Sequence, residues 1–172
     1  MARPDDFLRH GDPAERRDEL RRYIGPNADS FLPVYDRMQA KQSSALPWTG
    51  FCWPAFFLGP VWFFYRKLWL FAGLLCAIIL AVALIPKLPP ISGLIVSFIS
   101  ARMARWLYLT DAMKRLEALR ETGQINRPGA IERAGGVSKP AAWISGIIFG
   151  LLYAVTLGLV VYAISEGYPP PQ

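Results

Sequence analysis

The residue types that most often perform catalysis are scarce in this chain of 172 residues and lie far apart in it. The one histidine, His10, lies in a charged N-terminal stretch, whereas Cys52 and Cys76 lie in apolar sequence without a CxxC spacing. A hydrolase needs a nucleophile beside a positioned base, and a zinc site needs several closely spaced ligands. We therefore predict no enzyme activity, no cofactor and no metal site, and interpret both cysteines as packing residues.

Two further patterns could indicate binding of phosphate or nucleic acid. Gly135 and Gly136 precede Ser138, but neither common form of glycine-rich phosphate loop is present. The net charge of +6 is not accompanied by a recognised nucleic-acid-binding motif. Attraction to anionic lipid is a simpler explanation of the basic residues, so we expect the lipid bilayer and not nucleic acid as a partner.

Arg102 is a charge at the end of an apolar stretch. It precedes Tyr108 by six residues, about 9 Å along a helix, so its side chain could extend to a membrane surface. The alternative is a functional buried charge, because ionisable residues inside a membrane often mark transport pathways. Arg102 is a candidate site residue under this second interpretation.

Small residues recur at every fourth position near the C-terminus. This small-residue seam consists of Ala142, Gly146, Gly150, Ala154 and Gly158. Shorter series occur within 73–81 and 93–101. Seams of this kind let helix backbones approach closely in lipid, where no hydrophobic force drives association. Either the three series pack together within one subunit, or the long seam docks a partner, which would be another copy or a larger membrane complex.

Three apolar stretches are candidates to carry these residues across a membrane: 69–85, 91–108 and 143–164. As helices they would measure from about 25 Å to about 33 Å, which is enough for a bilayer core. The segment that precedes them, 48–69, contains ten of the chain's 23 aromatic residues. Aromatic rings favour the headgroup level, and Pro54 and the Gly59-Pro60 pair interrupt a straight helix. We therefore predict an interfacial or re-entrant element there, not a fourth span.

The distribution of Lys and Arg predicts the orientation. With three spans, 18 of the 19 basic residues lie on one side, and only Lys87 lies on the other. Since cytoplasmic loops carry the excess of basic residues, the N-terminus is expected in the cytoplasm and the C-terminal tail outside. If the aromatic segment also crossed, the basic residues would divide almost equally.

The polar regions also contain helix signals. Asp12, Pro13 and Glu15 predict a helix start, and Gly25 predicts its end. A second short helix would carry an apolar stripe, which consists of Phe31, Val34, Tyr35 and Met38. The stripe needs a partner, either the membrane surface or the cytoplasmic ends of the later helices. Residues 101–122 are expected to form an amphipathic arm on or near the inner membrane surface.

Several motifs together resemble a known family. They are Tyr23-Ile24-Gly25-Pro26-Asn27-Ala28, the run from Trp53 to Trp62 with Ala55-Phe56-Phe57-Leu58-Gly59-Pro60, Tyr65-Arg66-Lys67, and Gly135-Gly136-Val137-Ser138. In these motifs the chain resembles a bacterial family of small membrane proteins, the domain of unknown function 2628. Members usually carry an Asn shortly before the pair that here is Leu107-Tyr108, and this chain has Ala104, Arg105 and Trp106 instead. The resemblance implies a bacterial cytoplasmic membrane location and no established activity.

The predicted fold is therefore an all-α membrane protein with three transmembrane helices, an aromatic re-entrant or interfacial element, and cytoplasmic amphipathic helices. Its expected parts are a cytoplasmic polar region (1–47), the aromatic segment (48–67), a transmembrane hairpin (68–108), an amphipathic arm and loop (109–141), a third span (142–164) and an outer tail (165–172). The predicted function is that of a non-catalytic accessory subunit or scaffold that binds through its membrane helices. The alternative is a small transporter or channel-like protein that uses Arg102.

Overall fold

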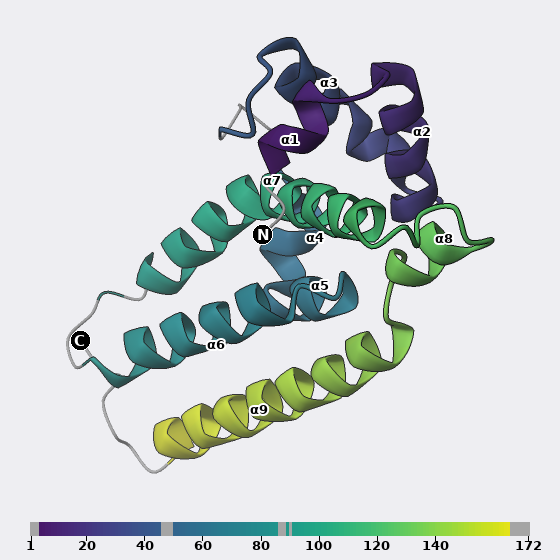
Figure 1. Cartoon of the computed structure of the whole chain (residues 1–172). Helices are drawn as coiled ribbons and strands as arrows, with labels where there is room; N and C mark the ends of the chain where they lie inside the picture. The colour runs from purple at the N-terminus through teal and green to yellow at the C-terminus, as the bar shows by residue number, and fades with distance from the viewer. Residues whose placement is uncertain (1–3, 46–49, 86–88, 90, 166–172) are drawn as a thin grey trace.

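The computed structural model describes residues 4–45, 50–85, 89 and 91–165, and in these ranges the chain is helical without any strand. The predicted all-α class is confirmed. The elements are α1 (Pro4–Arg9), α2 (Pro13–Ile24), the 3-10 turn η1 (Ala28–Ser30), α3 (Leu32–Ala40), α4 (Trp53–Leu58), α5 (Pro60–Tyr65), α6 (Trp69–Leu84), α7 (Ile91–Glu121), α8 (Ala130–Ala134) and α9 (Lys139–Ser165). Figure 1 shows α1 to α3 gathered on one side of α7, and α6 and α9 on the other.

Local signals account for the boundaries of α2. The Asp12 carboxylate accepts a hydrogen bond from the Ala14 backbone N–H at 3.1 Å, and Pro13 occupies the first turn. Gly25 ends the helix with a φ of +79°, a conformation that side chains other than hydrogen disfavour. The helix start and end predicted from the sequence are thus both present.

The helices α1 to α3, together with the second half of α7, form what we call the head. The apolar stripe of Phe31, Val34, Tyr35 and Met38 is buried there. The rings of Phe31 and Tyr108 lie 5.1 Å apart, so the stripe packs on α7. The sequence left open whether the stripe packs on the membrane surface or on the end of a later helix. In the structure it packs on a later helix, α7.

The arm predicted at 101–122 differs from the expectation. Leu109, Met113 and Leu116 are fully buried in the head instead of lying free for a membrane surface. The sequence periodicity correctly indicated an apolar face, but periodicity does not tell which surface covers that face. Here α1, α2 and α3 cover it, because their own apolar residues need the same protection from water.

The aromatic segment forms two short helices that meet at Gly59. Leu58 ends α4, Pro60 begins α5, and Gly59 between them has a φ of +49°. Helix α4 contacts α7, and α5 contacts both α6 and α9. The broken segment therefore lies among the long helices and joins them to the head.

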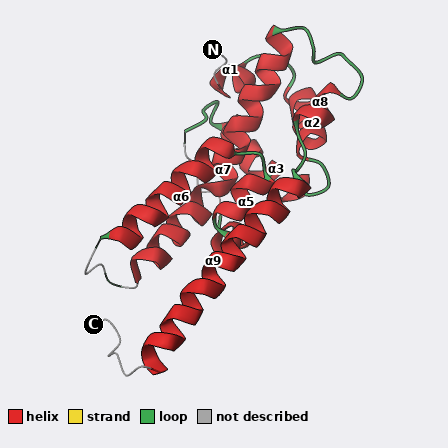
Figure 2. Cartoon of the chain, turned by 90° about the horizontal axis from the view of Figure 1, so that it is seen from below, coloured by secondary structure: helices red, strands yellow, loops and turns green. Residues whose placement is uncertain are grey.

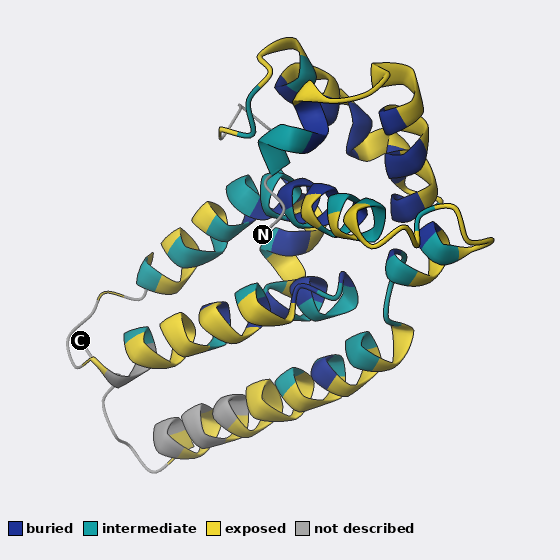
Figure 3. Cartoon of the chain, viewed as in Figure 1, coloured by how far each residue is buried: buried dark blue, intermediate teal, exposed yellow. Residues whose placement is uncertain are grey.

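The long helices α6, α9 and the first half of α7 extend away from the head (Figures 1 and 2). Exposed large apolar side chains of the described residues lie within 53–99 and 143–162, whereas the apolar residues of the head are buried. Figure 3 shows this division, with buried residues gathered in the head and exposed ones along α6 and α9.

One segment of the described chain, Ala130–Val155, is long and apolar enough to cross a membrane. It takes in α8 and the first part of α9. Helix α6 is shorter, and Arg102 and Arg105 make the first part of α7 less apolar. The predicted total of three transmembrane helices therefore stays a prediction.

Candidate functional site

The small-residue seam lies along α9, where only its first members approach another helix. Ala142 and Gly146 are partly buried near α5, whereas Gly150 and Ala154 are exposed. A methyl group added at Gly146, Gly150 or Gly158 would meet no atom within 4 Å. The same is true of Gly73 and Gly93 on the shorter series, so none of these glycines is a point of close helix packing within the described chain.

Arg102 is partly buried on α7 and interacts with its surroundings. It does not line the largest cavity of this region, whereas Arg105, three residues further on, does. The arginine of α7 that lines this cavity is therefore Arg105 and not Arg102, which the sequence pattern indicated.

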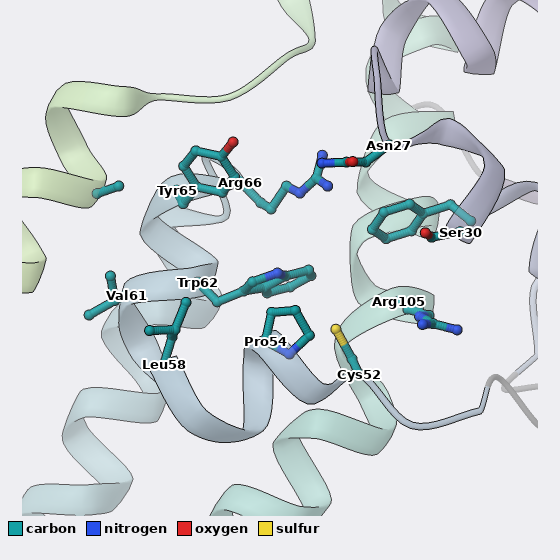
Figure 4. Close-up of a pocket in the computed structure, with 12 residues that line it drawn as sticks. Asn27, Ser30, Cys52, Pro54, Leu58, Val61, Trp62, Tyr65, Arg66 and Arg105 are labelled. Atoms are coloured by element: carbon teal, nitrogen blue, oxygen red, sulfur yellow. The ribbon is translucent and has the colours of Figure 1, made fainter.

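This cavity, of about 410 Å³, lies where the aromatic segment meets the head and α9. Four stretches far apart in the sequence supply its walls, at 27–31, 52–66, 105 and 142. The lining residues are Asn27, Ser30, Phe31, Cys52, Pro54, Leu58, Val61, Trp62, Tyr65, Arg66, Arg105 and Ala142. Figure 4 shows the side chains of the head and those of the aromatic segment facing each other across it. We call it the Arg66 pocket.

Arg66 is the principal charge of this pocket. Its residue is only 5% exposed, and its guanidinium carbon lies 4.9 Å from the ring centres of both Phe31 and Tyr108. Tyr65 and Trp62 lie at 5.8 Å and 6.0 Å. Contacts between a guanidinium and aromatic faces stabilise a desolvated cation by about 2 kcal/mol or more. The four rings therefore form a cage that holds a buried positive charge.

Part of the hydrogen-bonding capacity of Arg66 is unused. Its Nε and Nη1 atoms are buried and have no hydrogen-bond partner in the described part of the chain. No carboxylate of the described residues forms an ion pair with it, and none of the described lining residues is acidic. Buried charges are normally paired, so an arginine in this condition is unusual.

The backbone around Arg66 is held by contacts from distant segments. The Ser138 N–H donates to the Tyr65 carbonyl oxygen at 2.8 Å, and the Lys67 ammonium donates to the Gly135 carbonyl oxygen at 2.6 Å. Arg115 donates to the Lys67 carbonyl oxygen at 3.2 Å. The end of α5 is thereby fixed between α7 and the loop that precedes α9.

The Gly135-Gly136 pair has a packing role in this arrangement. The Gly136 N–H donates to the Tyr23 carbonyl oxygen at 2.8 Å, and a methyl group at Gly135 would overlap the same carbonyl. Only glycine permits an approach this close. The glycine pair attaches the connection between α8 and α9 to the end of α2.

The ionisable phenols of the head do not supply a catalytic base. Burial raises the pKa of Tyr35 to about 12 and raises that of Tyr23 as well, so both remain neutral at physiological pH. Cys52 lines the pocket, but the one histidine of the chain, His10, hydrogen-bonds within α1 and is not among the described lining residues. The described lining has the residue types for binding an anion, and neither a histidine nor a carboxylate is among them.

A second cavity, of about 300 Å³, lies between α6 and α7 and differs in character. Its described lining residues are Phe63, Phe71, Leu74, Leu75, Ile78, Val96, Ile99, Ser100, Met103 and Leu107. Only Ser100 carries a polar side chain, and no ionisable residue lines it. This cavity suits an alkyl chain better than an ion or a polar solute.

Arg66 belongs to the Tyr65-Arg66-Lys67 motif, but no pattern in the sequence identified it as a site residue. The signal that could have revealed it was its position directly after the aromatic run, which has no acidic residue nearby. Its contacts with Phe31 and Tyr108 were not accessible from the sequence, because these residues lie far from it along the chain.

Comparison with known proteins gives one match. A family model described as "Protein of unknown function (DUF2628)" matches residues 17–112. This range contains every described residue that lines the Arg66 pocket except Ala142. No curated protein and no solved structure matches the chain.

Proposed function

The chain belongs to the family of proteins of unknown function DUF2628, and from this premise we propose that it is a non-catalytic integral membrane protein, an accessory subunit or scaffold that binds through its membrane helices. The proposed location is the cytoplasmic membrane of a bacterium, with the N-terminal head in the cytoplasm and the C-terminus outside. No activity of the family guides the proposal, so it rests on the surface of the molecule.

The observation that carries the proposal is the division of the apolar surface. In the described residues, the head buries its apolar side chains around α7, whereas α6, α9 and the first half of α7 expose theirs. Examples are Leu70 at 79%, Leu151 at 62% and Phe98 at 53% exposure. An apolar surface that spans several helices is unstable in water and suits lipid or a partner. Three membrane-crossing helices would bring it into contact with lipid.

The aromatic segment and the basic residues support the orientation. Exposed Trp53, Trp69 and Trp143 lie near the junction of the long helices and the head, where a headgroup layer would begin. Arg66, Lys67 and the basic residues of the second half of α7 lie on the head side of that junction. A cytoplasmic head is what the positive-inside rule predicts.

Fractionation and reporter fusions test this proposal. The full-length protein, expressed in bacteria, is expected to remain in the membrane pellet after washing at high salt and at alkaline pH. A reporter that works only in the cytoplasm should be active at the N-terminus, and a reporter that works only outside should be active at the C-terminus. Release by the wash would contradict membrane integration, and cytoplasmic activity at both ends would contradict three spans.

The transporter alternative has less support. A transport path through the helices would need polar groups along it, and the described lining of the cavity between α6 and α7 is apolar except for Ser100. Among the described residues, Arg102 lines neither the Arg66 pocket nor the cavity between α6 and α7. Replacement of Arg102 by Leu should therefore leave membrane insertion normal.

A further inference from the structure

We propose that the Arg66 pocket binds the phosphate of an anionic amphiphile, with the phosphate at Arg66 and an alkyl chain along the apolar side between α5 and α9. The inference rests on the proposed membrane location, because a lipid is the amphiphile that such a location supplies. The same chemistry could come from a soluble phosphate compound, and the experiment below separates the two sources.

The first argument is the state of Arg66. It is a charge that is 95% buried, borders the cavity and has two nitrogens without a hydrogen-bond partner in the described chain. The aromatic cage stabilises the cation through ring faces, but ring faces cannot replace acceptors for its N–H groups. A phosphate would supply both the missing negative charge and the acceptor oxygens, and arginine is the residue best suited to phosphate.

The second argument is the set of groups near Arg66. Arg105 lines the same pocket from α7, and Asn27 and Ser30 line it from the head. Figure 4 shows the Arg66 guanidinium directed toward Asn27 and the head. Amide and hydroxyl groups donate hydrogen bonds to phosphate oxygens, and no described lining residue is a carboxylate that would repel them. One side of the pocket is therefore cationic and rich in donors.

The third argument is the opposite wall of the pocket. Pro54, Leu58 and Val61 form it, and Ala142 completes it from α9. A neighbouring hollow of about 300 Å³ shares Tyr65 and Ala142 with the pocket, and Lys139, Trp143 and Gly146 line the rest of it. An apolar wall that leads toward the surface of α9 fits an alkyl chain attached to the phosphate. A free phosphate ion would leave this wall unused.

The experiment measures binding to the purified full-length protein in detergent by the rise in its midpoint of thermal unfolding. The probes are short-chain phosphatidylglycerol, phosphatidylcholine of the same chain length, and inorganic phosphate. A ligand that binds the folded state raises the midpoint in a concentration-dependent way. We expect a clear rise with phosphatidylglycerol and a smaller one with phosphatidylcholine or inorganic phosphate.

Substitutions in the Arg66 pocket test whether phosphatidylglycerol binds there. Arg66→Gln and Arg105→Gln should each weaken phosphatidylglycerol binding by about tenfold or more, since each removes a charge-assisted contact. Ala142→Phe should weaken binding of the lipid and leave that of inorganic phosphate unchanged, because it narrows only the apolar side. Arg127→Gln removes one exposed charge that does not line the pocket and is the matched control, for which wild-type binding is expected.

The outcomes separate the proposals. In one outcome, inorganic phosphate and phosphatidylglycerol raise the unfolding midpoint equally, with no effect of Ala142→Phe. That result would contradict a lipid ligand and indicate a soluble phosphate compound. If Arg105→Gln binds phosphatidylglycerol as the wild-type protein does, the Arg66 pocket is not the binding site. This result is decisive even if Arg66→Gln does not fold. If the wild-type protein stays in the membrane pellet but no probe shifts its unfolding, only this inference fails. If the protein is released by the alkaline wash, the proposed function itself fails.

Discussion

Gly135 illustrates how a single residue can determine the packing of distant segments. Its Cα lies so close to the Tyr23 carbonyl oxygen that a side chain would overlap it, and that carbonyl already accepts the Gly136 N–H. Neighbouring contacts tie Lys67 and Tyr65 to the same loop. The pair of glycines thus joins the end of α2, the end of α5 and the start of α9.

The Gly135→Ala substitution is expected to destabilise the protein by about 1–3 kcal/mol, because the added methyl group meets backbone atoms that cannot move aside easily. The measurement is the midpoint of thermal unfolding in detergent. Gly146→Ala is the matched control, since nothing lies within 4 Å of its added methyl group. A stability unchanged by Gly135→Ala would show that the loop does not pack on Tyr23 as described.

Arg66 is the second case at the residue scale. A buried arginine without a carboxylate is stable only if its surroundings replace water, and four aromatic rings do so in part. The ring contacts come from Phe31, which follows η1, and from α5 and α7, so the cage exists only when the head is docked on the aromatic segment. The arginine therefore links the integrity of the head to the pocket beside it.

At the scale of elements, α7 has two different surfaces along its length. Its first half exposes Ile91, Leu94 and Phe98, whereas its second half is enclosed by the head. Charged residues help to hold α2 against this second half. Arg16 lies 3.3 Å from Glu117, and Arg120 lies 2.6 Å from Glu19. The side chains of Arg16 and Glu19 are only 4% and 5% exposed, so the pairs are largely screened from water.

Removal of one member of this network should weaken the docking of α2 on α7. We expect Glu19→Ala to lower the free energy of unfolding by about 3 kcal/mol, since Arg16 and Arg120 then lose a partner in a buried setting. The control is Asp36→Ala, which breaks the exposed pair with Arg17, where the side chains are 44% and 47% exposed. That change should cost less than about 1 kcal/mol. Denaturant unfolding of both variants measures the two losses in the free energy of unfolding. Equal losses would contradict a stabilising role of the buried network.

At the scale of the whole molecule, the small-residue seam is the surface whose partner matters most. Gly150 and Gly158 are exposed and have open space beside them, so the structure does not bury the seam within one subunit at these positions. A seam with this property is available to a second copy or to another membrane protein. Both possibilities belong to the proposed accessory or scaffold role.

Gly150→Ile tests the seam as a docking surface. Because no atom lies within 4 Å of a methyl group at this position, the variant should fold and insert normally. If the seam docks a partner, gel filtration in a mild detergent should show loss of a larger complex and a retained monomer. Leu151→Ile, at an exposed neighbouring position outside the seam, is the control and should leave the complex intact. Loss of expression of Gly150→Ile would indicate packing within the subunit instead.

Much of the secondary structure could be predicted from the sequence because its causes are local. The Asp12 cap, the end of α2 at Gly25 and the apolar stripe of α3 each depend on residues within a few positions of one another. The same holds for the apolar stretches and for the apolar face of residues 101–122. These features determine that the chain is helical and which faces avoid water.

The tertiary structure decided which surfaces meet. The sequence left open whether the stripe of α3 would lie on a membrane or on another helix, and it predicted residues 101–122 at the membrane surface; in the structure the two bury each other in the head. Arg66 likewise becomes a site only through Phe31 and Tyr108, which approach it from distant parts of the chain. Periodicity and composition report the need for burial but not the partner, because the partner is selected by packing between residues far apart in sequence.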